Sequence, residues 1–139
     1  ELEDLLANIR KIAEEYGIHI NEKKTRIVKI SSTYKFLQVK YSLTKDGKII
    51  KRINPERVTA MRRKFKKLAT KLANGEIEYE NVENMFRSWM GSFYKLLSKV
   101  QRKNLVQLYE DLFDKTVTVV NKKLVIYDRS PQEKSQEVD

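Results

Sequence analysis

The sequence predicts an α+β fold: an N-terminal helix, short strands and a β-hairpin, followed by a three-helix bundle. Two patterns support this prediction. Apolar residues recur at steps of three and four in residues 1–16, and again from residue 54 onward, as on the buried face of a helix. Between these segments, residues 35–53 place strand-favouring side chains on both sides of an Asp-Gly turn.

The N-terminal segment predicts one helix and two short strands. The amphipathic helix over residues 1–16 should end at Gly17, which adopts a left-handed C-cap most readily. Apolar residues alternate in residues 18–20 and resume in residues 27–30, with a polar turn at 21–24 between them. We therefore expect two short strands, or one strand with a flanking loop.

The middle of the chain predicts a β-hairpin and the start of a long helix. Residues 35–43 and 48–53 should form the two arms, because Asp46-Gly47 accommodates a tight turn. Asn54 can then cap a helix, and Pro55 suits its first position.

The remaining chain predicts a helical bundle and a final hairpin. The helices are expected at residues 54–73, 80–100 and 103–114, and the hairpin at 117–127. Residues 129–139 have the composition of a disordered tail.

Composition narrows the class of protein. A chain of 139 residues allows one domain or two small subdomains. It has no cysteine, which excludes disulfides and cysteine-based metal sites and is compatible with a cytoplasmic location. No apolar run approaches the roughly 20 residues of a membrane-spanning helix, so we expect no membrane partner.

The positive charge is concentrated in one segment. Eleven basic and two acidic residues lie between Lys45 and Lys71, so this segment carries +9 of the chain's net +10. Such a concentration attracts polyanions, and the phosphate backbone of a nucleic acid is the obvious partner.

The basic residues of the helix at 54–73 gather away from its apolar stripe. The stripe comprises Val58, Met61, Phe65, Leu68 and Leu72. A solvated face is the ordinary alternative, but acidic residues that could form ion pairs within the helix are almost absent. We therefore favour nucleic-acid binding. The predicted contact residues, on the opposite face and its flank, are Arg62, Arg63, Lys66, Lys67, Thr70 and Lys71.

Two blocks of the chain carry a resemblance to a known family: Gly17-Ile18-His19-Ile20-Asn21-Glu22-Lys23-Lys24-Thr25, and then Tyr34-Lys35-Phe36-Leu37-Gln38. In this order they resemble consecutive blocks of bacterial reverse transcriptases of the group II intron type, with retron and diversity-generating enzymes as alternative relatives. The resemblance implies that residues 1–53 end a polymerase palm, that 54–127 form a helical thumb, and that 128–139 form a flexible tail.

The resemblance also implies roles for individual residues. Phe36, Leu37 and Gln38 correspond to the primer grip, although most relatives carry Gly where this chain has Gln38. Lys24 corresponds to a lysine proposed to act near the departing pyrophosphate. The alternative is that Lys24 and Thr25 only stabilise a turn.

No Tyr-x-Asp-Asp sequence occurs, so the resemblance implies a non-catalytic C-terminal fragment of an RNA-directed DNA polymerase. Its expected partners are a template–primer duplex (RNA or RNA–DNA hybrid), the upstream fingers–palm part and further copies of itself. No cofactor is expected in this chain, whereas the full-length enzyme should use Mg²⁺. The alternatives are a stand-alone basic helical RNA-binding module, such as a maturase arm, or a protein-interaction adaptor.

Other chemistry is not indicated by the sequence. His19, the single histidine, lies between two isoleucines and is expected to be structural. Glu110, Asp111 and Asp114 are close in sequence on a predicted helix, but we do not expect a metal site there. No nucleophile–base set or Gly-rich phosphate loop is present.

Overall fold

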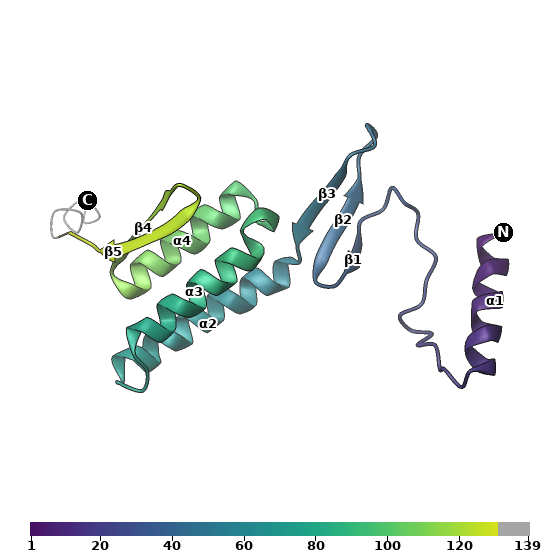
Figure 1. Ribbon diagram of the computed structural model, residues 1–139, viewed down its shortest axis with the longest axis horizontal. Coiled ribbons are helices and arrows are strands. Elements are labelled where there is room, and N and C mark those ends of the chain that lie inside the picture. The colour runs from purple at the N-terminus through teal and green to yellow at the C-terminus, as the bar shows by residue number, and fades with distance from the viewer. Residues whose placement is uncertain (131–139) are drawn as a thin grey trace. The chain divides into compact units, whose positions relative to one another are not determined.

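The computed structural model describes residues 1–130 and confirms the α+β class (Figure 1). This part of the chain contains four α-helices and five short strands. In order, the elements are α1 (Leu2–Glu15), β1 (Tyr34–Phe36), β2 (Val39–Leu43), β3 (Ile49–Ile53), α2 (Pro55–Ala73), α3 (Tyr79–Phe93), the 3₁₀ helix η1 (Tyr94–Leu96), α4 (Lys99–Phe113), β4 (Lys115–Val120) and β5 (Lys123–Asp128).

The chain divides into two units. The first comprises residues 1–34 and 42–50, and the second comprises 35–41 together with the chain from residue 51 onward. The short segment 35–41 therefore belongs with the helices, although it lies far from most of them in sequence.

The first unit contains α1 and a long irregular segment. The predicted C-cap is confirmed, because Gly17 has φ +69° and Ile18 N donates to Ala13 O at 2.8 Å. The strands predicted at 18–20 and 27–30 are wrong, since both segments are irregular. Alternating apolar residues become a strand only where a neighbouring strand completes their hydrogen bonds, and none pairs with these two segments in the described part of the chain.

The three-stranded sheet has the order β1-β2-β3. The predicted Asp-Gly turn joins β2 to β3, with Gly47 at φ +77°. The predicted arm at 35–43 is not one strand, because the chain turns at Leu37 and Gln38 to make β1 and β2. Both residues have positive φ, 48° and 71°, as a two-residue hairpin turn of this kind requires.

The core of the second unit lies between α2, α3 and α4. Aromatic rings from all three helices meet there: Phe65 lies 5.7 Å from both Phe86 and Tyr109, measured between ring centroids. Burial raises the pKa of the Tyr109 hydroxyl above its usual range, and its hydrogen bond with the Tyr79 hydroxyl, 2.8 Å away, raises it further. Ile53, at the end of β3, is also buried in this core.

The prediction of one helix over residues 80–100 is wrong for its C-terminal part. α3 ends at Phe93, a turn of 3₁₀ helix follows, and Leu97 is extended with ψ 138°. Ser98 and Gln101 then form a capping box, with each side chain hydrogen-bonded to the other residue's backbone N–H. This reciprocal pair of hydrogen bonds starts a new helix at Lys99. The apolar pattern by itself continues through this point without a break.

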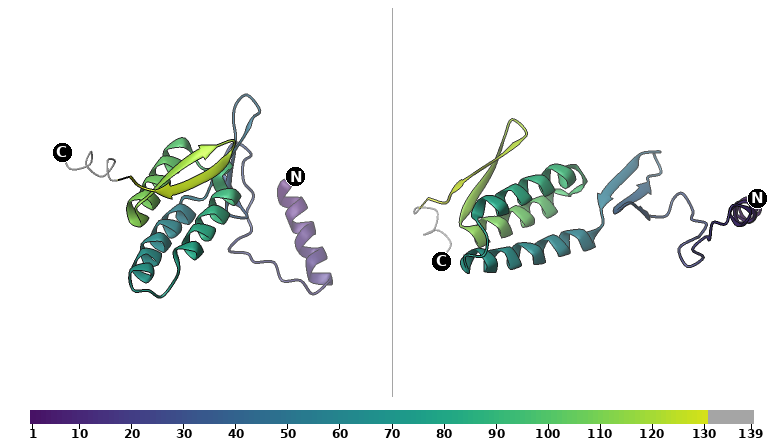
Figure 2. Two further views of the ribbon diagram at one scale, coloured as in Figure 1. Left: turned by 60° about the vertical axis from the view of Figure 1, so that its left-hand side comes forward. Right: turned by 60° about the horizontal axis from the view of Figure 1, so that its bottom comes forward.

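The predicted terminal hairpin is confirmed. β4 and β5 are antiparallel, from Lys115 opposite Asp128 to Val120 opposite Lys123. The hairpin lies on α3 and α4, while α2 runs along the other side of the bundle (Figure 2). Arg129 N donates to Asp114 O, so the chain is still attached to the bundle after β5. The tail predicted at 129–139 lies, from residue 131, outside the described residues.

Within residues 1–130, no helix combines the length and apolarity needed to cross a membrane.

Candidate nucleic-acid interface

The start of α2 is tied to the turn between β1 and β2. Asn54 is buried, and its side chain accepts a hydrogen bond from Glu56 N, as predicted for a cap before Pro55. The backbone N–H of Asn54 donates to Gln38 O at 3.0 Å. Lys35 Nζ, on β1, lies 3.8 Å from the Glu56 carboxylate. The segment predicted to grip a primer is therefore bonded to the beginning of the helix predicted to bind a duplex.

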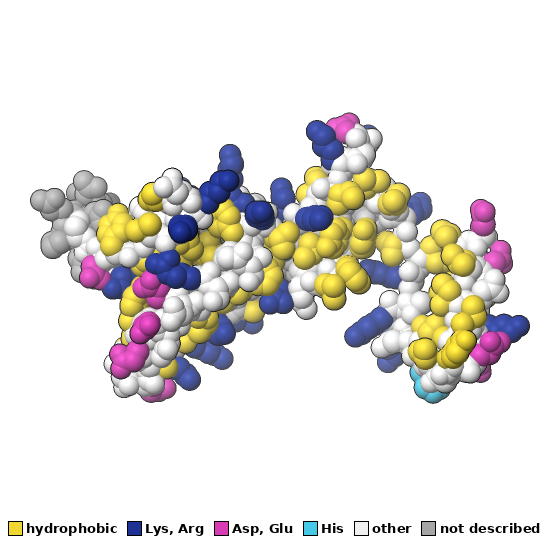
Figure 3. All heavy atoms as spheres, viewed as in Figure 1, with side chains coloured by type: hydrophobic (Ala, Val, Ile, Leu, Met, Phe, Trp, Pro, Cys, Tyr) yellow, Lys and Arg dark blue, Asp and Glu magenta, His cyan; other side chains and the backbone are white. Residues whose placement is uncertain are grey.

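The core fixes which face of α2 points outward. Met61 and Phe65 are buried, so the residues on the other side of the helix face solvent. All six predicted contact residues are exposed, namely Arg62, Arg63, Lys66, Lys67, Thr70 and Lys71. Figure 3 shows dark blue side chains gathered along the edge of the bundle beside α2. We call these six residues the basic face.

The cations of the basic face have no acidic partners in the part of the chain that the structure describes. Among residues 1–130, none of its five lysines and arginines forms an ion pair. Thr70 donates its hydroxyl proton to Lys66 O at 3.2 Å. Like charges one turn apart repel each other, and this repulsion is relieved when an anion binds.

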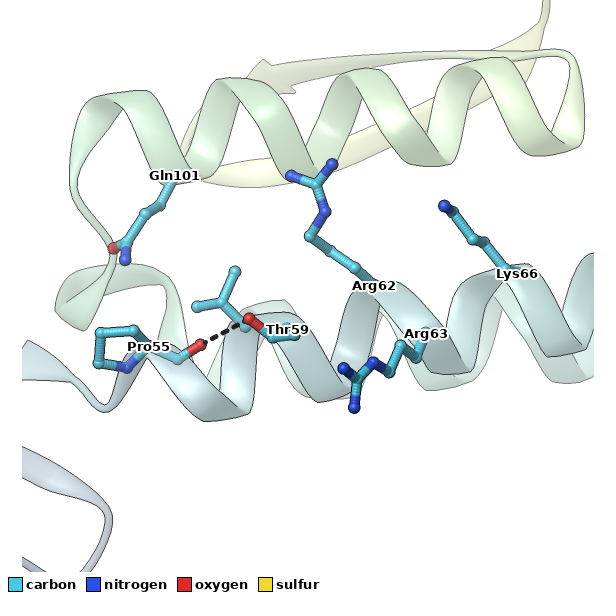
Figure 4. Close-up of a pocket in the computed structure, with 7 residues that line it drawn as sticks. Pro55, Thr59, Arg62, Arg63, Lys66 and Gln101 are labelled. Carbon is cyan, nitrogen blue, oxygen red and sulfur yellow. Dashed lines mark hydrogen bonds between the residues drawn. The ribbon is translucent and has the colours of Figure 1, made fainter.

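A shallow groove of about 450 Å³ lies along one flank of the basic face (Figure 4). Arg62 and Lys66 extend from α2 toward α4, and Gln101 on α4 lies near the end of the groove that Pro55 lines. Arg63 also lines the groove, but points away from α4 in this view. A groove with guanidinium and ammonium groups along one wall suits a row of phosphates.

The structure separates the predicted contact residues into two sets. Arg62, Arg63 and Lys66 line the groove, whereas Lys67, Thr70 and Lys71 are exposed on α2 outside it. Thr59 and Gln101 also line the groove, and sequence reasoning missed both. Thr59 lies one helical turn before Arg62 and Arg63, so helical spacing could have found it. Gln101 comes from another helix, and no sequence signal pointed to it.

The three predicted primer-grip residues lie in and beside the β1–β2 turn. Phe36 is 60% exposed and Leu37 is 79% exposed, so neither side chain belongs to the core. Gln38 is also exposed. The turn thus presents two large apolar side chains to solvent, on the segment whose backbone is bonded to Asn54.

Lys24 lies in the polar turn of the first unit and is exposed. Its backbone N–H donates to Asn21 O at 3.0 Å, and the Thr25 hydroxyl donates to the same oxygen at 2.9 Å. The turn-stabilising interpretation therefore accounts for Thr25 and for the Lys24 backbone. A role for the Lys24 ammonium near pyrophosphate stays a prediction.

The acidic residues at the end of α4 form ion pairs. Arg129 lies 3.2 Å from the Asp111 carboxylate and 3.8 Å from that of Glu110. No group of three potential metal ligands occurs within the described residues. His19 is exposed in the irregular segment, so its predicted place in a strand is wrong.

Comparison of this chain with protein families, with curated proteins and with solved structures finds no match.

Proposed function

We propose that this chain binds a nucleic-acid duplex by its phosphate backbone, through the basic face of α2 and the groove beside it. The observation that carries the proposal is an exposed row of five cations without an acidic partner among residues 1–130, held outward by a packed core. Contacts to phosphate fix the position of a duplex without reading its sequence.

The β1–β2 turn supports a more specific form of the proposal. Its backbone is bonded to Asn54 at the start of α2, and Phe36 and Leu37 are exposed beside it. A duplex lying on α2 would have one strand end near these apolar side chains. Such a connection could hold a primer end in one position, and fixed positioning of reacting groups makes a large contribution to the rate of a reaction.

We therefore propose that the chain is the primer- and duplex-binding part of an RNA-directed DNA polymerase, as the sequence blocks suggest. In this proposal, a fingers–palm segment supplies the carboxylates that bind Mg²⁺. The present chain holds the duplex and the primer end in position. Polymerisation is expected only when that segment is added.

Binding of a labelled, blunt RNA–DNA hybrid, followed by fluorescence anisotropy, tests the proposal. The variant Lys66→Glu/Lys67→Glu should bind several-fold more weakly than the unchanged chain, since two attractive contacts become repulsive. The control Lys99→Glu/Lys103→Glu changes the net charge equally on exposed positions of α4 that do not line the groove. Equal affinity of the two variants would contradict the proposal.

The same titration separates the alternatives. A stand-alone RNA-binding module would bind duplex RNA through α2 but would not restore polymerisation to a fingers–palm segment. A protein adaptor would bind an acidic protein that a hybrid duplex does not displace.

A further inference from the structure

A second pocket lies on another side of the bundle, where the β4–β5 hairpin meets α3, η1 and the start of α4. Its volume is about 700 Å³, within the range of sites that hold a small organic ligand or a nucleotide. It shares no lining residue with the groove beside α2. The two sites can therefore be changed separately.

The pocket has an apolar part beside a flat cationic group. Val119 and Leu124 supply accessible apolar surface, whereas Met90, which also lines the pocket, is only 1% exposed. Arg102 lies over the Tyr94 ring, 4.0 Å from its centroid, and donates from Nε to Tyr94 O at 2.9 Å. These two contacts hold the guanidinium plane in one orientation at the pocket wall. A fixed guanidinium plane is a surface on which a nucleobase stacks.

Cationic residues also line this pocket. Arg87, Lys95, Lys122 and Lys123 line the pocket together with Arg102, and no acidic residue lines it. The Arg87 guanidinium is paired with Glu83 and also donates to Leu124 O, which joins α3 to β5. The three lysines form no ion pair among residues 1–130. Figure 3 shows dark blue side chains gathered near the β4–β5 turn.

Gly91 leaves the pocket open. It lies in α3, and a Cβ built on it would have no atom within 4 Å. A methyl group at this position would therefore meet no other atom, whereas a large side chain would occupy part of the pocket. Glycine stands here in a helix where alanine would be the more stable choice.

From these observations we infer that the pocket binds one unpaired nucleotide of a single-stranded nucleic acid. The base stacks on the Arg102 guanidinium beside Val119 and Leu124, and the adjoining phosphates lie against Lys95 and Lys123. The combination fits this partner because a single strand offers an exposed base face and a row of negative charges together. A blunt duplex offers only the charges.

The inference does not rest on the proposed duplex binding by α2, because different residues carry it. If both hold, the chain binds a duplex by one side of the bundle and a single-stranded extension by another.

The experiment measures anisotropy of three labelled probes with the full chain: a short single-stranded RNA, a blunt RNA–DNA hybrid and AMP. Gly91→Leu should weaken single-strand binding by about tenfold, the loss expected when one stacked base is excluded, and leave hybrid binding unchanged. Gly91→Ala is the matched control, and should retain binding because a methyl group fills little of the space. Lys95→Glu/Lys123→Glu should also weaken single-strand binding, whereas Lys99→Glu/Lys103→Glu should not.

The outcomes distinguish this inference from the proposed function. Selective loss of single-strand binding in Gly91→Leu supports the pocket even if α2 variants bind hybrid normally. Unchanged single-strand binding in Gly91→Leu, with a circular dichroism spectrum like that of the unchanged chain, overturns the inference. Binding of AMP as tight as that of the single strand also overturns it, because the pocket would then be a site for free nucleotides.

Discussion

The ring of Tyr109 on α4 stacks on the ring of Phe86 on α3, with centroids 3.9 Å apart and planes inclined by 15°. Phe65 on α2 contacts both rings. This triplet sets the rotation of α2 about its axis, because Phe65 can face the two stacked rings in only one orientation. The direction of the basic face is thus a consequence of aromatic packing on the other side of the same helix.

The aromatic triplet should dominate the stability of the bundle. Phe65→Ala removes a fully buried ring and should lower the free energy of unfolding by about 3–5 kcal/mol, measured by urea denaturation. Phe36→Ala, at an exposed position, is the control and should cost far less. If the two substitutions had similar effects, Phe65 would not be a core residue.

Stability should fall at alkaline pH. Burial raises the pKa of Tyr109 in the folded chain, and burial also raises that of Tyr79. Groups with a raised pKa stabilise the fold fully below their unfolded pKa of about 10, and this contribution is lost as pH rises above that value.

Tyr109→Phe tests this assignment. The loss of stability between about pH 9 and 11 should be less steep in this variant, because one of the two hydroxyls with a raised pKa is no longer present to ionise when the chain unfolds. A slope unaltered by Tyr109→Phe would mean that other groups cause the alkaline loss.

The β1–β2 turn should become more stable with glycine. Gln38 has φ +71°, where a Cβ costs about 1–2 kcal/mol. Removing the Cβ relieves this cost, but glycine is also more flexible in the unfolded chain, which offsets part of the benefit. Gln38→Gly should therefore raise the free energy of unfolding by up to about 1 kcal/mol. Slower hydrogen exchange of the Asn54 amide, which donates to Gln38 O, is the readout. Gln38→Ala keeps the Cβ and should show no gain.

The apolar face of α1 should promote association. Leu2, Leu5, Ile9 and Ile12 are each about half exposed, and α1 has no buried residue. We expect sedimentation velocity to show oligomers that increase with protein concentration. Leu5→Lys/Ile9→Lys should abolish them, whereas Ala7→Lys/Glu14→Gln changes the charge equally on the polar side and should not. If the protein stayed monomeric at all concentrations, the prediction that α1 mediates self-association would be contradicted.

Much of the fold follows from local signals that agree with one another. α2 has a capping residue, a proline at its first position and an apolar stripe, and the structure has each of them in the predicted role. Gly75, with φ +72°, follows the end of this helix. The β4–β5 turn at Asn121 and Lys122 was also predictable, because asparagine tolerates positive φ. The exposure of the basic face could be predicted from the apolar stripe. When the stripe of a helix packs into the core, the opposite face of the helix points to solvent.

Of the remaining features, the end of α3 has only a local signal that the apolar pattern hides, and the others depend on contacts distant in sequence. The apolar stripe of α3 continues past Leu97, and only the capping box of Ser98 shows that a new helix begins. The positive φ of Leu37 and Gln38 is unfavourable locally and is maintained by strand pairing and by the bond to Asn54. Both pockets join different helices, so spacing along one helix could not reveal them.

The most direct test of duplex binding by α2 is the salt dependence of affinity for a blunt RNA–DNA hybrid. Binding of the unchanged chain should weaken steeply between about 50 and 200 mM salt, because phosphate contacts release counterions. In Lys66→Ala/Lys67→Ala/Lys71→Ala, the plot of log affinity against log salt concentration should be less steep by roughly two to three, about one for each lost contact. An unchanged slope would show that these lysines do not touch phosphate, and would contradict the central claim.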